Sequence, residues 1–304
     1  MNLFDLIYHK IPKDKKYILS VALAHDFDVL SSVSRAVSIN LIEAILVGDE
    51  TMILKIAKEH GLSLVNCRII DEPDMVLASE IAVRLVSSGE ANLLMKGLVD
   101  TSILLKAVLN KEWGLRGEHI FSHVFVANIP GYDRLFLVSD AAMNIAPDLT
   151  MKKQIIENCL PIANALGIEN PKVAIVCAVE KVNPKMQATL DAKELSDMQK
   201  RGEITGCTVD GPFGFDNAVS ELAAKHKGMT NPNAGKADIL IMPAIEAGNI
   251  LYKAITFFAK GSVACMISGA KAPIVLTSRA DSDSDKLNSI ALACLMAGKS
   301  DYNK

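Results

Sequence analysis

Residues 272–296 read APIVLTSRADSDSDKLNSIALACLM and combine a strand-like run, a polar turn and a helix-like segment. The run at 272–276 is apolar and contains β-branched side chains, which is typical of a buried strand. After the aspartates, apolar residues recur at three- and four-residue spacing and predict one face of a helix: Leu287, Ile290, Ala291, Cys294 and Leu295. A strand that leads directly into a helix is the repeating unit of an α/β protein.

The same alternation extends along the whole chain. Other apolar, β-branched runs lie near residues 20, 46, 95, 125, 137, 175 and 240, and amphipathic segments such as 28–39 and 152–167 separate them. This pattern predicts an α/β fold with a largely parallel sheet. A chain of 304 residues is long enough for two domains. The segment 225–238, rich in Gly, Asn and Pro, is expected to be a surface crossover.

Composition limits the partners that the chain can have. The net charge is −3, and acidic and basic residues are scattered, so there is no broad basic surface for nucleic acid or an anionic membrane. No apolar run approaches the roughly 18 to 20 residues of a membrane span, and the N-terminus does not resemble a signal peptide. We therefore expect a cytoplasmic protein that binds neither nucleic acid nor membranes.

Cysteine and histidine spacing argues against a structural metal or a disulfide framework. The six cysteines lie far apart with no Cys-x-x-Cys, so each is expected to be a small buried residue. His119 and His123 stand four residues apart, but no third ligand is near in sequence. We predict no metal at this pair.

The common nucleotide and hydrolase motifs are absent as well. The chain has no Gly-x-Gly-x-x-Gly, P-loop, His-Glu-x-x-His or Gly-x-Ser-x-Gly sequence. Asp281, Asp283 and Asp285 imitate the start of a calcium loop. Lys286 nevertheless stands where that loop requires glycine, and Leu292 where it requires glutamate. No metal site is predicted here either.

The aspartate cluster has two interpretations. Ser282 and Asp285 can form a variant of the capping box, and acidic residues in a first turn suit the helix dipole. Alternatively, Ser278, Arg279 and Asp285 meet at a strand end beside a helix N-terminus, where α/β sheets bind ligands and anions. The residues alone leave both interpretations open.

Five blocks of the chain resemble the phosphate acetyltransferase and phosphate butyryltransferase family. That family carries a Ser-Arg pair with an aspartate six residues beyond the arginine, which here are Ser278, Arg279 and Asp285. The blocks are MKGLVDTS (95–102), SDAAMNIAPD (139–148), DGPFGFDNAVS (210–220), AGKADILIMPAIEAGNILYK (234–253) and ISGAKAPIVLTSRADSDSD (267–285). The sequences of these blocks resemble the butyryl branch more closely than the acetyl branch.

The resemblance implies exchange of an acyl group between a short-chain acyl-CoA and inorganic phosphate in a ternary complex, with coenzyme A as a substrate and no cofactor. Asp285 would remove the proton of the CoA thiol, whose pKa of about 8.5 leaves little thiolate at neutral pH. Ser278 would hydrogen-bond the sulfur or the developing oxyanion, and Arg279 would hold phosphate through its planar fork. These are the three expected catalytic residues.

Further residues are expected to bind substrate. Thr101 and Ser102 match hydroxyl positions that the family uses near phosphate, and Lys106 falls about where the acetyl enzymes have an arginine, although an ammonium lacks its bidentate geometry.

Lys96 and Asp100 follow an apolar strand and either line the site or form a solvated pair at the strand end. Asn249 is a further substrate-binding candidate, although Gly248-Asn249 is also an ordinary turn sequence.

The resemblance also implies the architecture. It indicates an isocitrate/isopropylmalate dehydrogenase-like fold of two α/β domains with a cleft between them. Domain one would comprise residues 1–118 and 270–304, and domain two residues 119–269. It further implies a homo-oligomer, at least a dimer.

Two other functions remain open. One is a metal-dependent decarboxylating dehydrogenase of the same fold, since Asp281 and Asp285 lie four residues apart on one predicted helix. The other is a non-catalytic CoA-binding protein.

Overall fold

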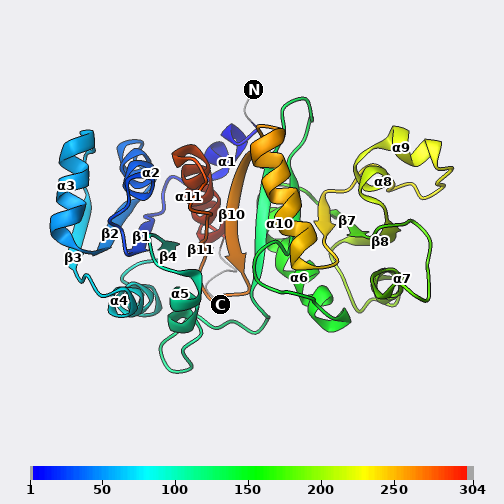
Figure 1. Ribbon diagram of the computed structural model, residues 1–304, viewed down its shortest axis with the longest axis horizontal. Helices are drawn as coiled ribbons and strands as arrows, with labels where there is room; N and C mark the ends of the chain where they lie inside the picture. The colour runs from blue at the N-terminus through cyan, green and yellow to red at the C-terminus, as the bar shows by residue number, and fades with distance from the viewer. Residues whose placement is uncertain (1–2, 300–304) are drawn as a thin grey trace. The chain divides into compact units, whose positions relative to one another are not determined.

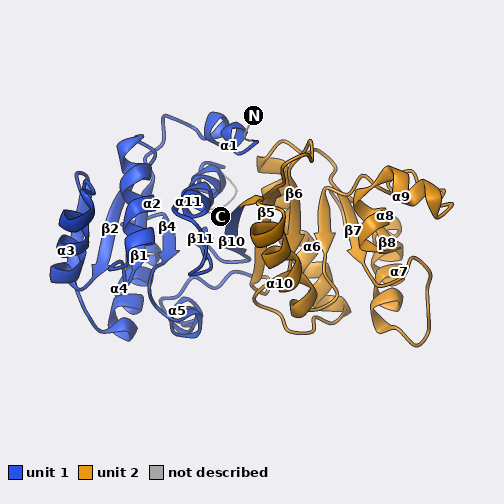
Figure 2. Cartoon of the chain, turned by 45° about the horizontal axis from the view of Figure 1, so that its top comes forward, with its two compact units in different colours: residues 1–118, 263–304 blue, residues 119–262 orange. Residues whose placement is uncertain are grey.

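The chain forms two compact units, which Figure 2 shows in different colours. The structure is a computed structural model and describes residues 3–299. Unit 1 comprises residues 1–118 and 263–304, and unit 2 comprises residues 119–262. The chain re-enters unit 1 at Val263, earlier than the expected position 270, because strand β10 (Ser262–Ser268) pairs with a strand of unit 1.

Unit 1 contains a mostly parallel sheet in the order β3-β2-β1-β4-β11-β10, in which only the β10–β11 pair is antiparallel. The strands are β1 (Ile18–Ala22), β2 (Glu43–Gly48), β3 (Cys67–Asp71), β4 (Leu93–Lys96) and β11 (Ile274–Val275), with β10 beside β11. The register pairs Ala22 with Lys96 and Val275 with Met95. The carboxyl ends of β1, β4 and β11 therefore lie side by side.

Helices cover both faces of the unit 1 sheet: α1 (Asp5–Lys10), α2 (Phe27–Ser38), α3 (Glu50–His60), α4 (Met75–Ser87), α5 (Thr101–Val108) and α11 (Asp283–Ala297). Helix α2 packs against α11 on one face and α4 packs against α5 on the other, as Figure 1 shows. Asp26 and Asp49 begin α2 and α3 by accepting backbone N–H bonds in the first turn. The caps thus fix where each helix leaves the strand before it.

Unit 2 contains neighbouring strands in the order β5-β6-β9-β7-β8, antiparallel only between β5 and β6. The strands are β5 (Ser122–Asn128), β6 (Phe136–Ser139), β7 (Lys172–Val176), β8 (Thr208–Phe213) and β9 (Ile239–Ile241). The helices are α6 (Leu149–Ala165), α7 (Gln187–Lys200), α8 (Phe215–Val219), α9 (Glu221–His226), α10 (Ile245–Lys253) and the π-helix η1 (Ala254–Phe258). Helix α6 packs against β5, β6 and β9.

These elements confirm the predicted α/β fold with largely parallel pairing, and each expected strand is present. Residues 227–238 connect α9 to β9, as expected of a crossover. Five cysteines are buried as predicted, and Cys67 is partly exposed. Within residues 3–299, no helix combines the length and apolar character needed to cross a membrane.

Two local expectations were wrong. Gly248-Asn249 is not a turn but lies within α10, where Gly248 packs so closely on the Asp140 carbonyl that an added Cβ would stand 2.2 Å from its oxygen. Helix α11 is not amphipathic either, because every residue from Lys286 to Ala297 is buried. The sequence predicted one buried face for α11, but the helix lies within the core and is buried on all sides.

Candidate functional site

The loops after β1 and β4 meet at the carboxyl edge of the unit 1 sheet. Gly97 N donates to Ala22 O at 2.9 Å, and Leu98 N donates to Leu23 O at 2.9 Å. A Cβ on Gly97 would lie 2.2 Å from Leu23 O, so only glycine permits this approach. Leu23 itself adopts a left-handed φ of 60°, a conformation that non-glycine residues rarely take outside constrained sites.

A pocket of about 50 Å³ lies at this edge. Its lining comes from the loops after β1, β4 and β11 and from the first turns of α2 and α11: Asp26, Val29, Lys96, Gly97, Leu98, Thr277, Ser278, Arg279 and Lys286. The lining contains three cationic side chains and one carboxylate, that of Asp26. Asp26 Oδ1 accepts the Val29 N–H at 3.0 Å as the cap of α2. Three positive groups thus converge on one small pocket.

Lys96 ends strand β4 and is only 6% exposed. Its Nζ donates to Gly97 O at 3.2 Å and to Val99 O at 3.0 Å. Burial lowers the pKa of Lys96, the positive charges of Arg279 and Lys286 lower it further, and nearby aspartates oppose the shift. Lys96 is therefore a buried cation that ties down the turn after its own strand.

Lys286 occupies the first turn of α11 and is 3% exposed. Its Nζ donates to Asp281 O at 2.5 Å, which fixes the polar turn before the helix. Within the described chain, neither Lys286 nor Lys96 forms an ion pair with a carboxylate. Sequence analysis missed Lys286 as a site residue, because the amphipathic pattern expected for α11 gave no reason to bury a lysine there.

Arg279 stands at the exposed rim of the pocket. Its Nη2 lies 2.8 Å from Asp100 Oδ1, and the two side chains are 65% and 64% exposed. Asp100 occupies the N-cap position of α5 but makes no side-chain cap bond, since its carboxylate faces Arg279 instead. Lys96 lines the pocket, which was one of the two alternatives expected for it, whereas Asp100 does not. The other alternative, a solvated Lys96–Asp100 pair, is not present, because the Lys96 ammonium is bound to backbone carbonyls and Asp100 pairs with Arg279.

The turn that presents Arg279 is closed by Asp281, which is 6% exposed. Asp281 Oδ2 accepts the Ser278 N–H at 2.7 Å, and Asp281 N donates to Ser278 O at 3.1 Å. Reciprocal bonds of this kind hold a short loop in one conformation. Ser278 and Arg279 consequently project from a fixed turn between β11 and α11.

Asp285 belongs to a capping box at the start of α11. Its backbone N donates to Ser282 Oγ at 3.1 Å, and its Oδ2 accepts from Ser282 Oγ at 2.6 Å. Its Oδ1 accepts the Val263 N–H of β10 at 2.9 Å. Burial raises the pKa of Asp285. The capping interpretation is confirmed. Asp285 does not line the pocket. Its carboxylate has about four lone-pair sites and can therefore accept further hydrogen bonds.

Ser282→Ala should lower the stability of unit 1 by removing this cap. Loss of an N-cap hydroxyl costs typically about 1 kcal/mol of folding free energy. Urea denaturation followed by circular dichroism measures the difference. Ser284→Ala is the matched control, since Ser284 Oγ bonds only to the Arg35 and Asp283 side chains. Equal midpoints for the two variants would contradict the capping role.

The remaining expected site residues lie outside this pocket. Thr101 is half-buried at the first position of α5, Ser102 is exposed beside it, and Lys106 is exposed in the last turn of the same helix. Asn249 belongs to unit 2, where its Nδ2 donates to Ala141 O at 3.4 Å. The pocket therefore brings together Ser278, Arg279 and Lys96 of the expected set.

No metal-binding cluster is evident in the chain from residue 3 to 299, where no three His, Cys, Asp or Glu side chains gather. His119 Nδ1 instead lies 3.1 Å from Asn158 Oδ1, a contact within unit 2.

Known proteins similar in sequence to this chain belong to one family. The profile of the phosphate acetyl/butaryl transferase family matches residues 72–294. The chain is 48% identical to a phosphate butyryltransferase of Clostridium beijerinckii over 97% of this chain and 98% of the relative. It is 49% identical to a phosphate acetyltransferase of Thermotoga maritima, over 94% and 96% of the two chains. A branched-chain phosphotransacylase from Enterococcus faecalis has a similar structure, with a TM-score of 0.82, 34% identity and coverage of 92% and 99%.

Proposed function

The chain belongs to the phosphate acetyl/butaryl transferase family and is an acyltransferase, and we propose that it moves a butyryl group between CoA and inorganic phosphate in a ternary complex. In one direction phosphate attacks the thioester carbonyl, the C–S bond breaks, and acyl phosphate and CoA leave. In the other, the CoA thiolate attacks the acyl phosphate and releases phosphate. No electrons are gained or lost, so the reaction needs no redox cofactor.

The observation that carries this proposal is the placement of Arg279 and Ser278 on one pocket with the buried Lys96. A guanidinium can grip two oxygens of a phosphate at once. The ion pair of Arg279 with Asp100 is largely exposed, and such pairs contribute only about 0 to 1 kcal/mol. An incoming phosphate can therefore displace Asp100 at small cost.

Asp285 and Ser278 complete the proposed chemistry. Asp285 accepts the proton of the CoA thiol, and its burial supports this role because a raised carboxyl pKa makes a stronger base. Ser278 donates to the sulfur or to the oxyanion that develops on the carbonyl oxygen. Thr101, Ser102 and Lys106 of α5 and Asn249 of α10 are proposed as further substrate contacts.

The acyl preference can be tested directly, since similar relatives carry both butyryl and acetyl names. We expect kcat/KM for butyryl-, isobutyryl- or valeryl-CoA to exceed that for acetyl-CoA. One methylene in an apolar pocket contributes roughly 1 to 3 kcal/mol, so the preference should be graded. Initial rates of thiol release with each acyl-CoA and saturating phosphate measure it. A clear preference for acetyl-CoA over all longer chains would overturn the butyryl assignment.

The same assay tests the function as a whole. The acyltransferase should release CoA from butyryl-CoA only when phosphate is present, without magnesium or a nicotinamide. A decarboxylating dehydrogenase would require both, and a non-catalytic CoA-binding protein would release no thiol. Phosphate-dependent thiol release that persists with a chelator present therefore supports the proposal.

We further propose that the two units correspond to the two domains of an isocitrate/isopropylmalate dehydrogenase-like fold. The resemblance of the five sequence blocks supports this and also supports a homo-oligomer in the cytoplasm. Size-exclusion chromatography with light scattering measures the oligomeric state.

A further inference from the structure

We infer that Lys286 and Lys96 form the inner wall of a phosphate site, with the phosphoryl oxygens held between their two ammonium groups and the Arg279 guanidinium at the rim. This inference rests on the proposed function and deepens it. It adds Lys286, which no sequence pattern indicated, and it gives Lys96 a role in binding the anion.

Burial of the two ammonium groups is the first step. Lys96 and Lys286 are 6% and 3% exposed and bond only to backbone carbonyls, with no carboxylate in an ion pair with either in the part of the chain described. Burying a charge without a counter-ion is costly, and an apolar side chain of similar volume is often tolerated or stabilising in such a place. A ligand of opposite charge supplies the missing counter-ion.

The charges around the pocket favour an anion. Lys96, Lys286 and Arg279 all line it, and the latter two lie close enough to lower the pKa of Lys96. Asp26 also lines it, but one of its carboxylate oxygens caps α2. Asp100, near Arg279, lies outside the lining and is exposed, so an entering anion can displace it.

The size of the pocket selects the kind of anion. A volume of about 50 Å³ suits one tetrahedral oxyanion and is too small for a nucleotide. Val29, Leu98 and Thr277 complete its lining. The site therefore fits the phosphoryl group of the reaction and not the adenosine part of CoA.

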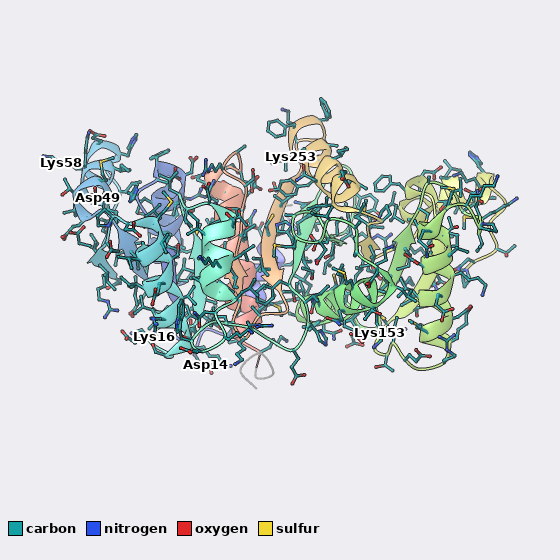
Figure 3. All side chains as sticks on the ribbon, turned by 60° about the horizontal axis from the view of Figure 1, so that its bottom comes forward. Asp14, Lys16, Asp49, Lys58, Lys153 and Lys253 are labelled. Carbon is teal, nitrogen blue, oxygen red and sulfur yellow. The ribbon has the colours of Figure 1, made fainter. Side chains whose placement is uncertain are left out.

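The test uses Lys286→Met and Lys96→Met, which keep an unbranched stem and remove the charge. We expect the KM for phosphate to rise at least tenfold in each, while the KM for butyryl-CoA stays within about threefold. Lys58→Met is the matched control, because Lys58 is an exposed lysine on α3 of the same unit (Figure 3) and does not line the pocket. It should behave like the wild type.

Thermal unfolding with inorganic phosphate alone gives an independent readout. Ligand binding to the folded state raises Tm, so phosphate should raise the Tm of the wild type and of Lys58→Met above that in potassium chloride of equal ionic strength. Neither pocket variant should show this rise. Without phosphate each variant loses a buried charge, which favours folding, and the bonds from its ammonium group to backbone carbonyls, which opposes it. The phosphate-linked rise in Tm is therefore the readout, and not the Tm itself.

The possible results separate the two proposals. Without phosphate-dependent thiol release by the wild type, the proposed function fails, whatever the lysine variants do. If the wild type is active but the variants keep its phosphate KM, or if their butyryl-CoA KM rises instead, the lysine site is wrong. A fall in Tm with an unchanged phosphate-linked rise would show that the lysines only tie the two turns, and would also overturn it.

Discussion

Asp285→Asn should lower kcat for butyryl-CoA formation roughly 10²- to 10⁴-fold at neutral pH, the usual contribution of a general base. The amide has the shape of the carboxylate and can still accept the Val263 N–H, but it cannot take a proton from the CoA thiol. Raising the pH towards the thiol pKa, about 8.5, should recover part of the rate because CoA then ionises unaided. Stopped assays of acyl-CoA formation between pH 6 and 9 measure both effects.

The acidic limb of the pH profile provides a second check. Burial raises the pKa of Asp285, so the wild type should lose activity as the pH falls through that raised value. The variant should lack this limb. The free energy of unfolding should change with pH in the opposite direction to activity. A carboxyl whose pKa is higher in the folded state stabilises the fold when it is protonated, and this contribution is lost as the pH rises through the folded pKa.

A folded variant with nearly wild-type turnover at pH 7 would leave Asp285 only its capping role. The loss would then be confined to about 0.3 to 1 kcal/mol of helix-dipole stability. Ser282→Ala distinguishes the two roles, because it removes the cap and leaves the carboxylate in place.

The sequence predicted most of the fold, because the evidence lies in local apolar periodicity. The strands β1, β2 and β4 are mostly aliphatic and almost wholly buried. The strands that were not anticipated lack this pattern: β3 is only partly buried, and β8 contains Gly211 and Pro212, which interrupt a β-branched run. Strand β10 is buried but mixes Ser, Ala and Cys with its aliphatic residues.

The site was predictable only where local sequence determines it. Ser282 and Asp285 are three residues apart, so the capping box could be anticipated from spacing. The pairing of Arg279 with Asp100 joins residues 179 positions apart and follows from the register of β4 beside β11. Lys286 lies in the site because α11 is buried on all sides. This burial results from packing against α2 and the sheet, so it cannot be predicted from the apolar periodicity of α11 alone.

The geometry of the Arg279 guanidinium distinguishes arginine from lysine at this position. Arg279 is exposed at the rim, where one of its nitrogens contacts the Asp100 carboxylate. The planar guanidinium presents its N–H groups as a fork that matches two oxygens of a phosphate. An ammonium at the same position offers a point charge on a more strongly hydrated group. The difference between arginine and lysine should therefore appear in phosphate binding and leave the binding of the thioester unaffected.

Arg279→Lys should raise the KM for phosphate roughly 10- to 150-fold, equivalent to the 1.5 to 3 kcal/mol of a charge-assisted hydrogen bond. The KM for butyryl-CoA should remain nearly unchanged, because the pocket beside Arg279 is too small for the nucleotide. Initial rates over a matrix of both substrates separate the two constants. Asp100→Asn is the matched control: it weakens the same ion pair but retains the guanidinium, so its phosphate KM should not rise. If Arg279→Lys instead weakens butyryl-CoA and spares phosphate, Arg279 belongs to the nucleotide site and the assignment of the anion to this pocket is wrong.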